Sequence, residues 1–216
     1  MQDRWVVLDV GETLIDETRV FHTWAEIFDL PDLTLMGVLG ASIAAADEPD
    51  RWRGFFDLLQ QPEWRDQQPA FEERYGDLRP SDLYPDAIRA IEALTAGGYR
   101  VAITANQPAR RHTELEALGV KVEAMAMSDA MGVGKPDPEF FRRTLELIGS
   151  PDPSAVAYVG DRVDNDVEPA AAAGMRAVWI RRGPWGFLHA DREGRAHLVV
   201  RTLDELVERI GEVWPD

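Results

Sequence analysis

The chain has 216 residues, of which 45% are hydrophobic, and it contains 7 Trp and no Cys. This length suits one domain with a sizeable core, or a core with a smaller inserted module, and the apolar content excludes a disordered linker. Its 23 basic and 39 acidic residues give a formal net charge of −16, which argues against nucleic acid or an anionic membrane surface as the main partner.

The first expected element is a short buried strand over residues 4–9, which ends in Asp9 and turns at Gly11. Its residues are apolar on both faces, so we expect it in the centre of a sheet rather than at an edge. Ligands gather at the carboxyl ends of the strands in open parallel sheets. Asp9 is therefore a candidate functional residue, and a carboxylate that merely caps the turn is the alternative interpretation.

Residues 17–82 form a second kind of segment. Apolar and aromatic side chains recur there at spacings near three or four, with no strand signal. Within it, Arg51-Trp52-Arg53 could present cations and an aromatic ring to a substrate, although a buried Trp between solvated arginines is the simpler interpretation. The segment is expected to form a small all-helical insert of about four helices, divided by prolines: Pro31, Pro49, Pro62 and Pro80.

From residue 84 onward, helical periodicity alternates with short apolar strands. This alternation predicts βαβ units and an α/β fold with a mainly parallel sheet. The expected strands cover residues 100–105, 122–127, 155–159, 176–180 and 197–200. The expected helices cover residues 85–94, 109–118, 138–148 and 166–173, with a final helix after the last strand.

A second group of carboxylates follows the strand expected over residues 155–159. Asp161 leaves this strand and Asp166 opens the next helix, so both can face one cation above the sheet. Mg²⁺ prefers oxygen ligands and keeps several waters, so a few carboxylates are enough to bind it. Helix capping by Asp164 or Asn165 explains part of this segment, but it does not explain Asp161 at the strand end.

Lys135 is the third candidate. It precedes Pro136, which restrains its backbone, and a helix is expected from residue 138. An ammonium held in this way suits a phosphoryl oxygen or a nucleophilic carboxylate that needs charge compensation. An isolated lysine would be interpreted as a surface residue, but the two carboxylate groups at strand ends favour a functional role.

Four segments, residues 9–14, 103–106, 132–141 and 159–166, together resemble the motifs of the haloacid dehalogenase superfamily of phosphotransferases in order and separation. The resemblance covers essentially the whole chain. It implies a Rossmann-like three-layer core formed by residues 1–16 and 83–216. It also implies that residues 17–82 are a helical cap domain, inserted after the first strand, which closes over the site and selects the substrate.

The resemblance also implies a role for each candidate residue. Asp9 would attack phosphorus and form an aspartyl-phosphate, a covalent intermediate that divides one difficult step into two. The Mg²⁺ cofactor would be bound by Asp9, the main-chain carbonyl of Gly11, Asp161 and Asp166, the last of them directly or through water. Lys135 would neutralise phosphate charge and orient Asp9, since positioning and charge compensation dominate phosphoryl transfer.

Gly11 is a first departure from the family pattern. Phosphatases of this family usually carry a second Asp two residues after the nucleophile, where it protonates the leaving group and then activates water. General acid–base catalysis contributes roughly 10²–10⁴-fold, or about 3–5 kcal/mol of barrier. A leaving group of low pKa needs little protonation, so we expect a preference for acyl phosphates or anomeric sugar phosphates.

Ala105 is a second departure, because the family usually places a phosphate-binding Ser or Thr directly before Asn106. Thr104 lies one residue earlier, and strand alternation points it to the opposite face. Phosphate binding at Ala105 and Asn106 would then depend on the backbone N–H groups of Asn106 and Gln107. Glu12 and Thr104 are candidate substitutes for the missing side chains.

The cysteine content and the distribution of apolar residues indicate the cellular compartment. Without Cys, neither disulfides nor thiolate metal sites can form. The first residues lack a basic stretch followed by an apolar leader, and no apolar run approaches the roughly 18 residues of a membrane helix. We expect a soluble cytoplasmic protein without a membrane partner, and the sequence does not indicate its oligomeric state.

Our leading hypothesis is a Mg²⁺-dependent phosphatase that acts on a small phosphorylated metabolite. The alternative is an impaired relative that binds metal or a phosphorylated ligand, or interacts with another protein, without catalysis. A third hypothesis is dehalogenation, in which the carboxylate attacks carbon without a metal. It is disfavoured because Asp161 and Asp166 beside an anionic substrate are costly without a cation.

Overall fold

The computed structural model describes residues 3–45, 51–188 and 195–215. The chain divides into two compact units, one formed by Met1–Asp16 with Leu78–Asp216 and the other by Glu17–Asp77. Residues 78–82, which the sequence assigned to the helical insert, belong to the first unit, where the Asp16 N–H donates to the carbonyl of Asp82 (2.8 Å). The first unit is called the α/β unit below, and the second is called the helical unit.

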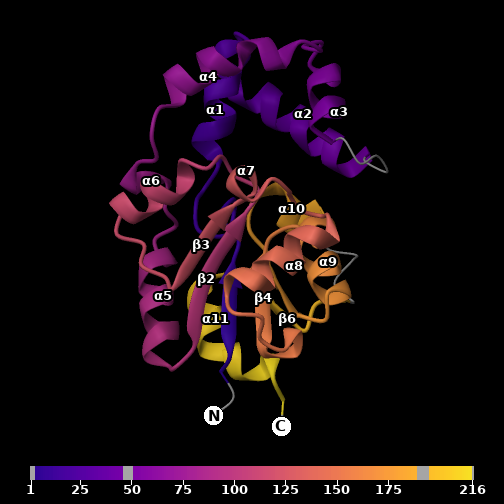
Figure 1. Cartoon of the computed structure of the whole chain (residues 1–216). Coiled ribbons are helices and arrows are strands. Elements are labelled where there is room, and N and C mark those ends of the chain that lie inside the picture. The colour runs from indigo at the N-terminus through magenta and orange to yellow at the C-terminus, as the bar shows by residue number, and fades with distance from the viewer. Residues whose placement is uncertain (1–2, 46–50, 189–194, 216) are drawn as a thin grey trace. The chain divides into compact units, whose positions relative to one another are not determined.

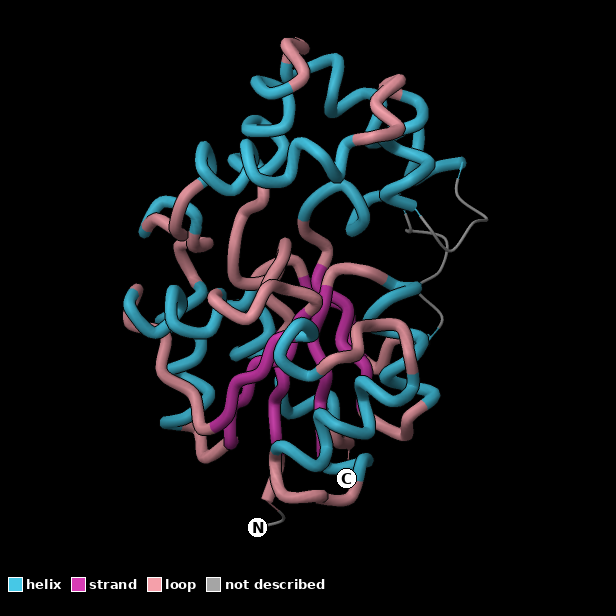
Figure 2. The backbone as a smooth tube through the Cα atoms, turned by 45° about the horizontal axis from the view of Figure 1, so that its top comes forward, coloured by secondary structure: helices cyan, strands magenta, loops and turns pink. Residues whose placement is uncertain are grey.

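The α/β unit contains one sheet of six parallel strands in the order β3-β2-β1-β4-β5-β6. The strands form a middle layer with helices on both sides (Figures 1 and 2), which is a Rossmann-like arrangement. The strand bounds are β1 Trp5–Leu8, β2 Arg100–Ala105, β3 Ala124–Met127, β4 Val156–Gly160, β5 Arg176–Ile180 and β6 Leu198–Val200.

The central place predicted for the first strand is confirmed, because β1 pairs with β2 on one side and β4 on the other. All four of its residues are buried. A strand covered by helices on both faces needs apolar residues at consecutive positions, which is why Trp5–Leu8 shows no polar alternation. The same register sets Leu8 beside Ile103 and Val159, so the ends of three strands lie next to each other.

The helices of the α/β unit follow its strands, as the sequence predicts. The start expected at residue 166 is wrong, because a π-helical turn, Val163–Val167, comes before α9. Two short helices, α7 and α10, were not predicted, since four and six residues are too few to show a period. The helix bounds are α5 Ala87–Ala96, α6 Arg111–Ala117, α7 Ser128–Met131, α8 Pro138–Leu147, α9 Glu168–Ala172, α10 Gly183–Leu188 and α11 Leu203–Arg209.

The helical unit is held together by aromatic rings. Trp24 stacks on Phe71, with ring centroids 4.6 Å apart, and Phe56 stacks on Trp64 at 4.3 Å. Trp24 also meets the edge of Phe56, which joins the two stacks into one cluster. The bounds are α1 Thr18–Ile27, α2 Asp32–Ala45, α3 Arg51–Leu58 and α4 Gln68–Tyr75, with a 3₁₀ turn at Trp64–Gln67.

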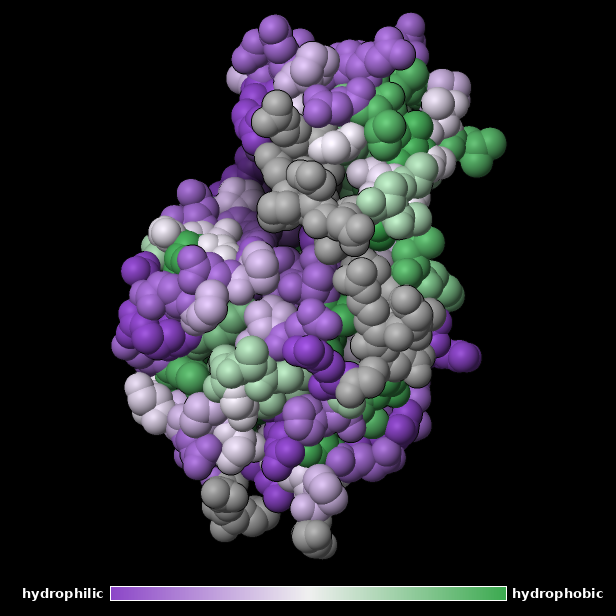
Figure 3. Space-filling model, turned by 90° about the vertical axis from the view of Figure 1, so that its right-hand side faces the viewer, coloured by the Kyte–Doolittle hydropathy of each residue, from purple (hydrophilic) through white to green (hydrophobic). Residues whose placement is uncertain are grey.

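The surface of the helical unit also carries hydrophobic side chains. Figure 3 shows hydrophilic residues over much of the face it draws, with hydrophobic ones gathered on part of the helical unit. Leu33 is 86% exposed and Leu58 is 57% exposed. The side chains of Arg51, Trp52 and Arg53, suggested above as substrate contacts, lie outside the described residues.

In the part of the chain that the structure describes, no helix taken alone has the length and apolar composition to cross a membrane. Among the described residues, one pair of helices, α1 and α2, passes that test together, by length and composition, and their axes are bent by 112°.

Candidate active site

The carboxylates predicted from two strand ends come together above the sheet. Asp9 follows β1 and Asp161 follows β4, and these two strands pair with each other. The Asp9 N–H continues the pairing by donating to the Val159 carbonyl (2.9 Å). Asp166 joins them from the π-helical turn. Oxygen atoms of Asp9, Asp161 and Asp166 lie within 4.8 Å of one another, and all three side chains are buried.

Lys135 enters the same cluster from the loop before α8. Its Nζ lies 2.7 Å from Oδ1 of Asp9 and 2.5 Å from Oδ1 of Asp166, and its side chain is 1% exposed. The loop ends where Asp137 caps α8 by accepting from the Glu139 N–H (2.9 Å). The structure therefore places one ammonium between two carboxylates, as a residue that orients Asp9 would require.

Asn106 holds Lys135 in place. Its Nδ2 donates to the Lys135 carbonyl (2.8 Å), and its Oδ1 accepts from the Lys135 N–H (2.7 Å). A Cβ on Gly134 would lie 2.9 Å from Oδ1 of Asn106, so a side chain at this position would displace the Asn106 amide. The sequence predicted Asn106 for phosphate binding but did not indicate this contact of its side chain.

Asp166 is fixed by a similar device. Its Oδ2 accepts from the Arg162 N–H (2.9 Å), which ties the π-helical turn back to the end of β4. A Cβ on Gly160 would lie 2.3 Å from Cγ of Asp166. The glycine at this position lets the carboxylate lie over the strand end, and the turn widens to bring it there.

Burial is the largest single influence on the pKa values of Asp9, Asp161 and Lys135. It raises the pKa of Asp9 to about 6, although the nearby Lys135 acts in the opposite direction. Burial, and then the charges of Asp166 and Asp9, raise the pKa of Asp161 well above its ordinary value. Burial alone would lower the pKa of Lys135, but the carboxylates of Asp166 and Asp9 outweigh it and raise that pKa.

The three carboxylates suit a divalent cation. One ammonium cannot balance three carboxylates, and within the described part of the chain Oδ2 of Asp161 is buried without a hydrogen-bond partner. The donor set consists of oxygen atoms, which Mg²⁺ prefers. The residues present therefore fit the cofactor expected from the sequence, and Gly11 lies in the turn directly after Asp9.

The contacts of the residues around Ala105 reduce the number of groups that could bind phosphate there. Thr104 is buried and its hydroxyl accepts from that of Thr144 on α8 (3.2 Å). Strand alternation predicted that Thr104 faces the side of the sheet opposite Ala105, and its hydroxyl is engaged with α8, which disfavours it as a substitute for the missing hydroxyl. The Gln107 N–H donates to the Ala105 carbonyl (3.0 Å), which leaves the Asn106 N–H as the backbone candidate.

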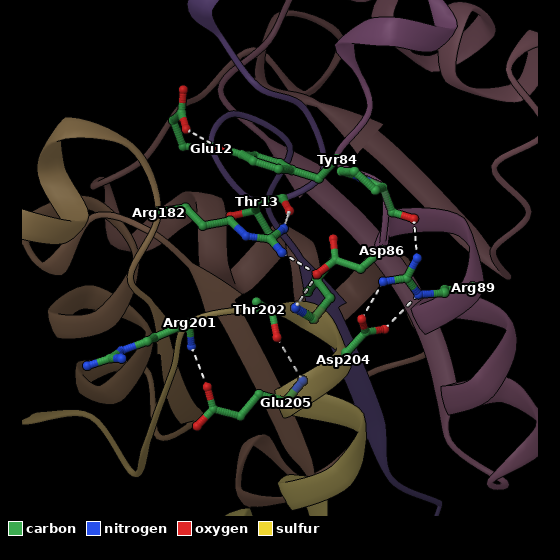
Figure 4. A network of polar contacts seen from close by, with 12 residues as sticks. Glu12, Thr13, Tyr84, Asp86, Arg89, Arg182, Arg201, Thr202, Asp204 and Glu205 are labelled. Atoms are coloured by element: carbon green, nitrogen blue, oxygen red, sulfur yellow. Dashed lines mark hydrogen bonds and ion pairs between the residues drawn. The ribbon is translucent and has the colours of Figure 1, made fainter.

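A polar network that was not predicted lies beside the loop after Asp9 (Figure 4). Arg182, after β5, donates to the Thr13 carbonyl (2.9 Å), and the Tyr84 hydroxyl donates to Oε2 of Glu12 (2.5 Å). A signal was present in the sequence, since Arg181 and Arg182 follow a strand in the same way as Asp9 and Asp161. The network also includes Asp86, which is paired with Arg182.

The fold and the site define a hydrolase in which a carboxylate and a lysine share one buried centre. Residues 4–174 match the family model of haloacid dehalogenase-like hydrolases. The chain belongs to this family, which confirms the resemblance drawn from its motifs.

Known proteins similar to this chain agree with that assignment. A glyceraldehyde 3-phosphate phosphatase of Methanocaldococcus jannaschii is 32% identical over 142 residues, which are 64% of this chain. The chain spans only 60% of that relative's length. A phosphoserine phosphatase of Thermus thermophilus is 31% identical over 176 residues, covering 76% of this chain and 69% of the relative.

A solved structure supports the fold over nearly the full length. The crystal structure of a HAD phosphatase from Thermococcus onnurineus aligns with a TM-score of 0.62 at 26% sequence identity. The alignment covers 98% of this chain and 99% of the other.

Proposed function

We propose that this chain is a Mg²⁺-dependent phosphatase that hydrolyses a small phosphorylated metabolite through an aspartyl-phosphate on Asp9. The observation that carries the proposal is the buried cluster of three carboxylates around the ammonium of Lys135. Relatives described as phosphatases of small phosphorylated compounds support the substrate class.

Asp9 would act in two steps. In the first, a bond forms between an oxygen of Asp9 and phosphorus, and the bond from phosphorus to the leaving-group oxygen breaks. In the second, water attacks phosphorus, the bond to Asp9 breaks, and inorganic phosphate is released. Lys135 holds Oδ1 of Asp9 at 2.7 Å, and the other carboxylate oxygen would then make the attack.

Phosphate and metal would be held by the groups around Asp9. Mg²⁺, when bound by Asp9, Asp161, Asp166 and the Gly11 carbonyl, supplies positive charge that offsets the carboxylates and the phosphoryl oxygens. The Asn106 N–H and Lys135 would bind the phosphoryl oxygens, and Ala105 contributes no hydroxyl.

The helical unit would serve as the cap. Glu17–Asp77 is a compact unit inserted between the strand that carries Asp9 and the remainder of the α/β unit. A separate unit can vary its residues without disturbing the catalytic cluster, which suits a role in substrate selection.

A series of phosphate esters graded by leaving-group pKa tests this function. We expect turnover that requires Mg²⁺, is abolished by chelation, and rises steeply as the leaving-group pKa falls, because Gly11 supplies no acid. Turnover without metal would contradict the metal site. A rate that does not depend on leaving-group pKa would contradict the claim that the site lacks a general acid.

The alternative function is binding without catalysis, in which the departures at Gly11 and Ala105 mark a lost activity. It predicts that Mg²⁺ and inorganic phosphate bind, measured by calorimetry, while none of the esters is hydrolysed. The ion pairs of Lys135 with Asp9 and Asp166 favour the phosphatase, because a binding module has no need for an oriented nucleophile.

A further inference from the structure

The loop that follows Asp9 is held by a buried arginine. Nη1 of Arg182 donates to the Thr13 carbonyl (2.9 Å), and Nη2 of the same guanidinium pairs with Asp86. Both side chains are less than one tenth exposed. One planar guanidinium thus serves a backbone carbonyl and a carboxylate at once, which the fixed fork of arginine nitrogens allows.

Asp86 is itself anchored, so Arg182 has a rigid partner. Asp86 directly precedes α5, and its Oδ2 also accepts from the Leu203 N–H (2.8 Å) at the start of α11. The backbone of Arg182 is fixed as well, because its N–H donates to the carbonyl of Ile180 at the end of β5 (3.0 Å). Two helices and a strand therefore determine where the guanidinium lies.

Tyr84 holds the same loop from a second direction (Figure 4). Its hydroxyl donates to Oε2 of Glu12 (2.5 Å), and its backbone N–H donates to the Leu14 carbonyl (2.9 Å). Its ring lies 4.1 Å from the guanidinium carbon of Arg182, so the tyrosine and the arginine also support each other.

Gly183 completes the arrangement around Glu12. A Cβ on Gly183 would lie 2.5 Å from Cγ of Glu12, so the glutamate side chain passes close to the backbone there. Glu12 has a φ of 48°, in the left-handed region that residues with a side chain seldom adopt. Such a conformation persists when surrounding contacts impose it, and Tyr84 and Gly183 supply those contacts.

We infer that Arg182 and Tyr84 are positioning residues that hold residues 10–13 so that the main-chain carbonyl of Gly11 stays fixed beside Asp9. The two residues after Gly11 are each tied down, Glu12 through its side chain and Thr13 through its carbonyl. The orientation of the Gly11 peptide then has little freedom. The inference rests on the proposed function, which makes that carbonyl a ligand of Mg²⁺.

Calorimetric titration of Mg²⁺ into the whole chain tests this inference. Tyr84→Phe keeps the ring and removes one hydroxyl, and Arg182→Lys keeps the charge facing Asp86 but loses the fork. Loss of groups that orient metal ligands weakens metal binding by about 10- to 100-fold, so we expect at least about a tenfold higher Mg²⁺ dissociation constant in both variants.

One further variant separates positioning from general damage. Arg89→Lys alters the exposed ion pair with Asp204 in the same network, and the hydrogen bonds of Arg89 go to Asp204 and to the Pro85 carbonyl, so its Mg²⁺ affinity should equal that of the wild type. An equal loss of affinity in Arg89→Lys would show general damage and would overturn the inference.

Kinetics supply a readout that a merely structural role would not move. With a phosphate ester that the wild type hydrolyses, the variants should need more Mg²⁺ for half-maximal rate, while their kcat at saturating Mg²⁺ recovers most of the wild-type value. A lower kcat with an unchanged Mg²⁺ requirement would overturn the inference.

The outcomes distinguish the inference from the proposed function. If the wild type binds Mg²⁺ and Tyr84→Phe binds it equally well, the inference is wrong and the proposed function stands. If the wild type binds no Mg²⁺, the proposed function fails and the inference fails with it. Should Arg182→Lys not fold, as circular dichroism would show, Tyr84→Phe still decides the question.

Discussion

The helical unit and the α/β unit bury different kinds of side chain. Among the described residues of the helical unit, the buried polar ones are Thr23 and Ser42, and its core is formed by rings such as those of Trp24 and Phe56. The α/β unit instead buries the cluster around Lys135 as well as an apolar core. In the described part of the chain, the core of the helical unit is built from uncharged side chains, whereas the α/β unit buries charges as well.

This difference has an energetic meaning. Buried rings remove apolar surface from water and stabilise the folded chain. Buried carboxylates lose hydration, and the raised pKa values of Asp9 and Asp161 show that their ionised forms are disfavoured where they lie. The α/β unit therefore holds groups that lower stability but are preorganised for chemistry, which is common at functional sites.

Substitution of the nucleophile is the most damaging change to function. Asp9→Asn should lower kcat/KM on the order of 10⁴-fold or more, because an amide cannot form the acyl-phosphate intermediate. The assay is steady-state hydrolysis of the best ester in the graded series. The exposed Asp204→Asn is the matched control and should retain full activity. A residual rate in Asp9→Asn close to that of the wild type would remove the nucleophile from the proposal.

Truncation of a ring in the helical unit should act on stability. Phe56 is fully buried between Trp24 and Trp64, so Phe56→Ala should lower the free energy of unfolding by about 3–5 kcal/mol. Urea denaturation measures the change, and Leu33→Ala, at a side chain that is 86% exposed, is the control with little expected effect. Equal losses in both variants would contradict the aromatic core.

Restoration of an acid should widen the range of substrates. Gly11→Asp returns the carboxyl that the family usually carries, and we expect about a 10²-fold faster turnover of alkyl phosphates with little gain on acyl phosphates. The slope of rate against leaving-group pKa should become shallower. A uniform gain on every ester would point to a change in phosphate or metal binding instead.

The pH dependence of stability should reveal the buried carboxylates. A carboxyl whose pKa is higher in the folded than in the unfolded chain binds its proton more tightly when folded. Its contribution to stability is therefore present at low pH and is lost as pH rises through the folded pKa. For Asp9 this window extends from its ordinary value of 3.8 to about 6, and for Asp161 it extends higher.

Thermal melting without metal measures this dependence. The melting midpoint of the wild type should fall as pH rises from 3.8 through about 6 and above, and Asp161→Asn should show a smaller fall because it removes one of the buried charges. Saturating Mg²⁺ should raise the midpoint of the wild type most at the higher pH. Parallel curves for the wild type and Asp161→Asn would show that Asp161 is not a source of the instability.

Much of the fold could be predicted because its signals are local. The strand of residues 5–8 is apolar on both faces, and this alone placed it inside a parallel sheet, where the structure shows it between β2 and β4. The π-helical turn at Val163–Val167 could not be predicted, since it depends on the contacts of Asp166 with Arg162 and Lys135. These contacts are made by the Asp166 side chain, one of them with a lysine from a distant loop, and neither contact leaves a periodic pattern in the sequence.

The charged residues of the candidate site could be predicted from the sequence, but the hydrogen bonds that hold them in place could not. Asp9 and Asp161 stand at strand ends, Asp166 was predicted to open the next helix, and Lys135 precedes a restraining proline; the structure brings all four together. The paired hydrogen bonds between Asn106 and the backbone of Lys135 join residues 29 positions apart. Only the folded chain shows such a contact, because nothing in either segment encodes its partner.

By itself, the sequence determined which residues have the chemistry for phosphoryl transfer and which expected groups are missing at Gly11 and Ala105. These are properties of residue type and spacing, which survive without coordinates. The tertiary structure alone decided that Arg182 and Tyr84 hydrogen-bond to the loop after Asp9. Arg182 is 169 residues from its partner Thr13, and Tyr84 is 72 residues from its partner Glu12. The physical reason is that hydrophobic periodicity specifies elements and their faces, whereas the meeting of distant polar groups depends on the order in which the strands pair.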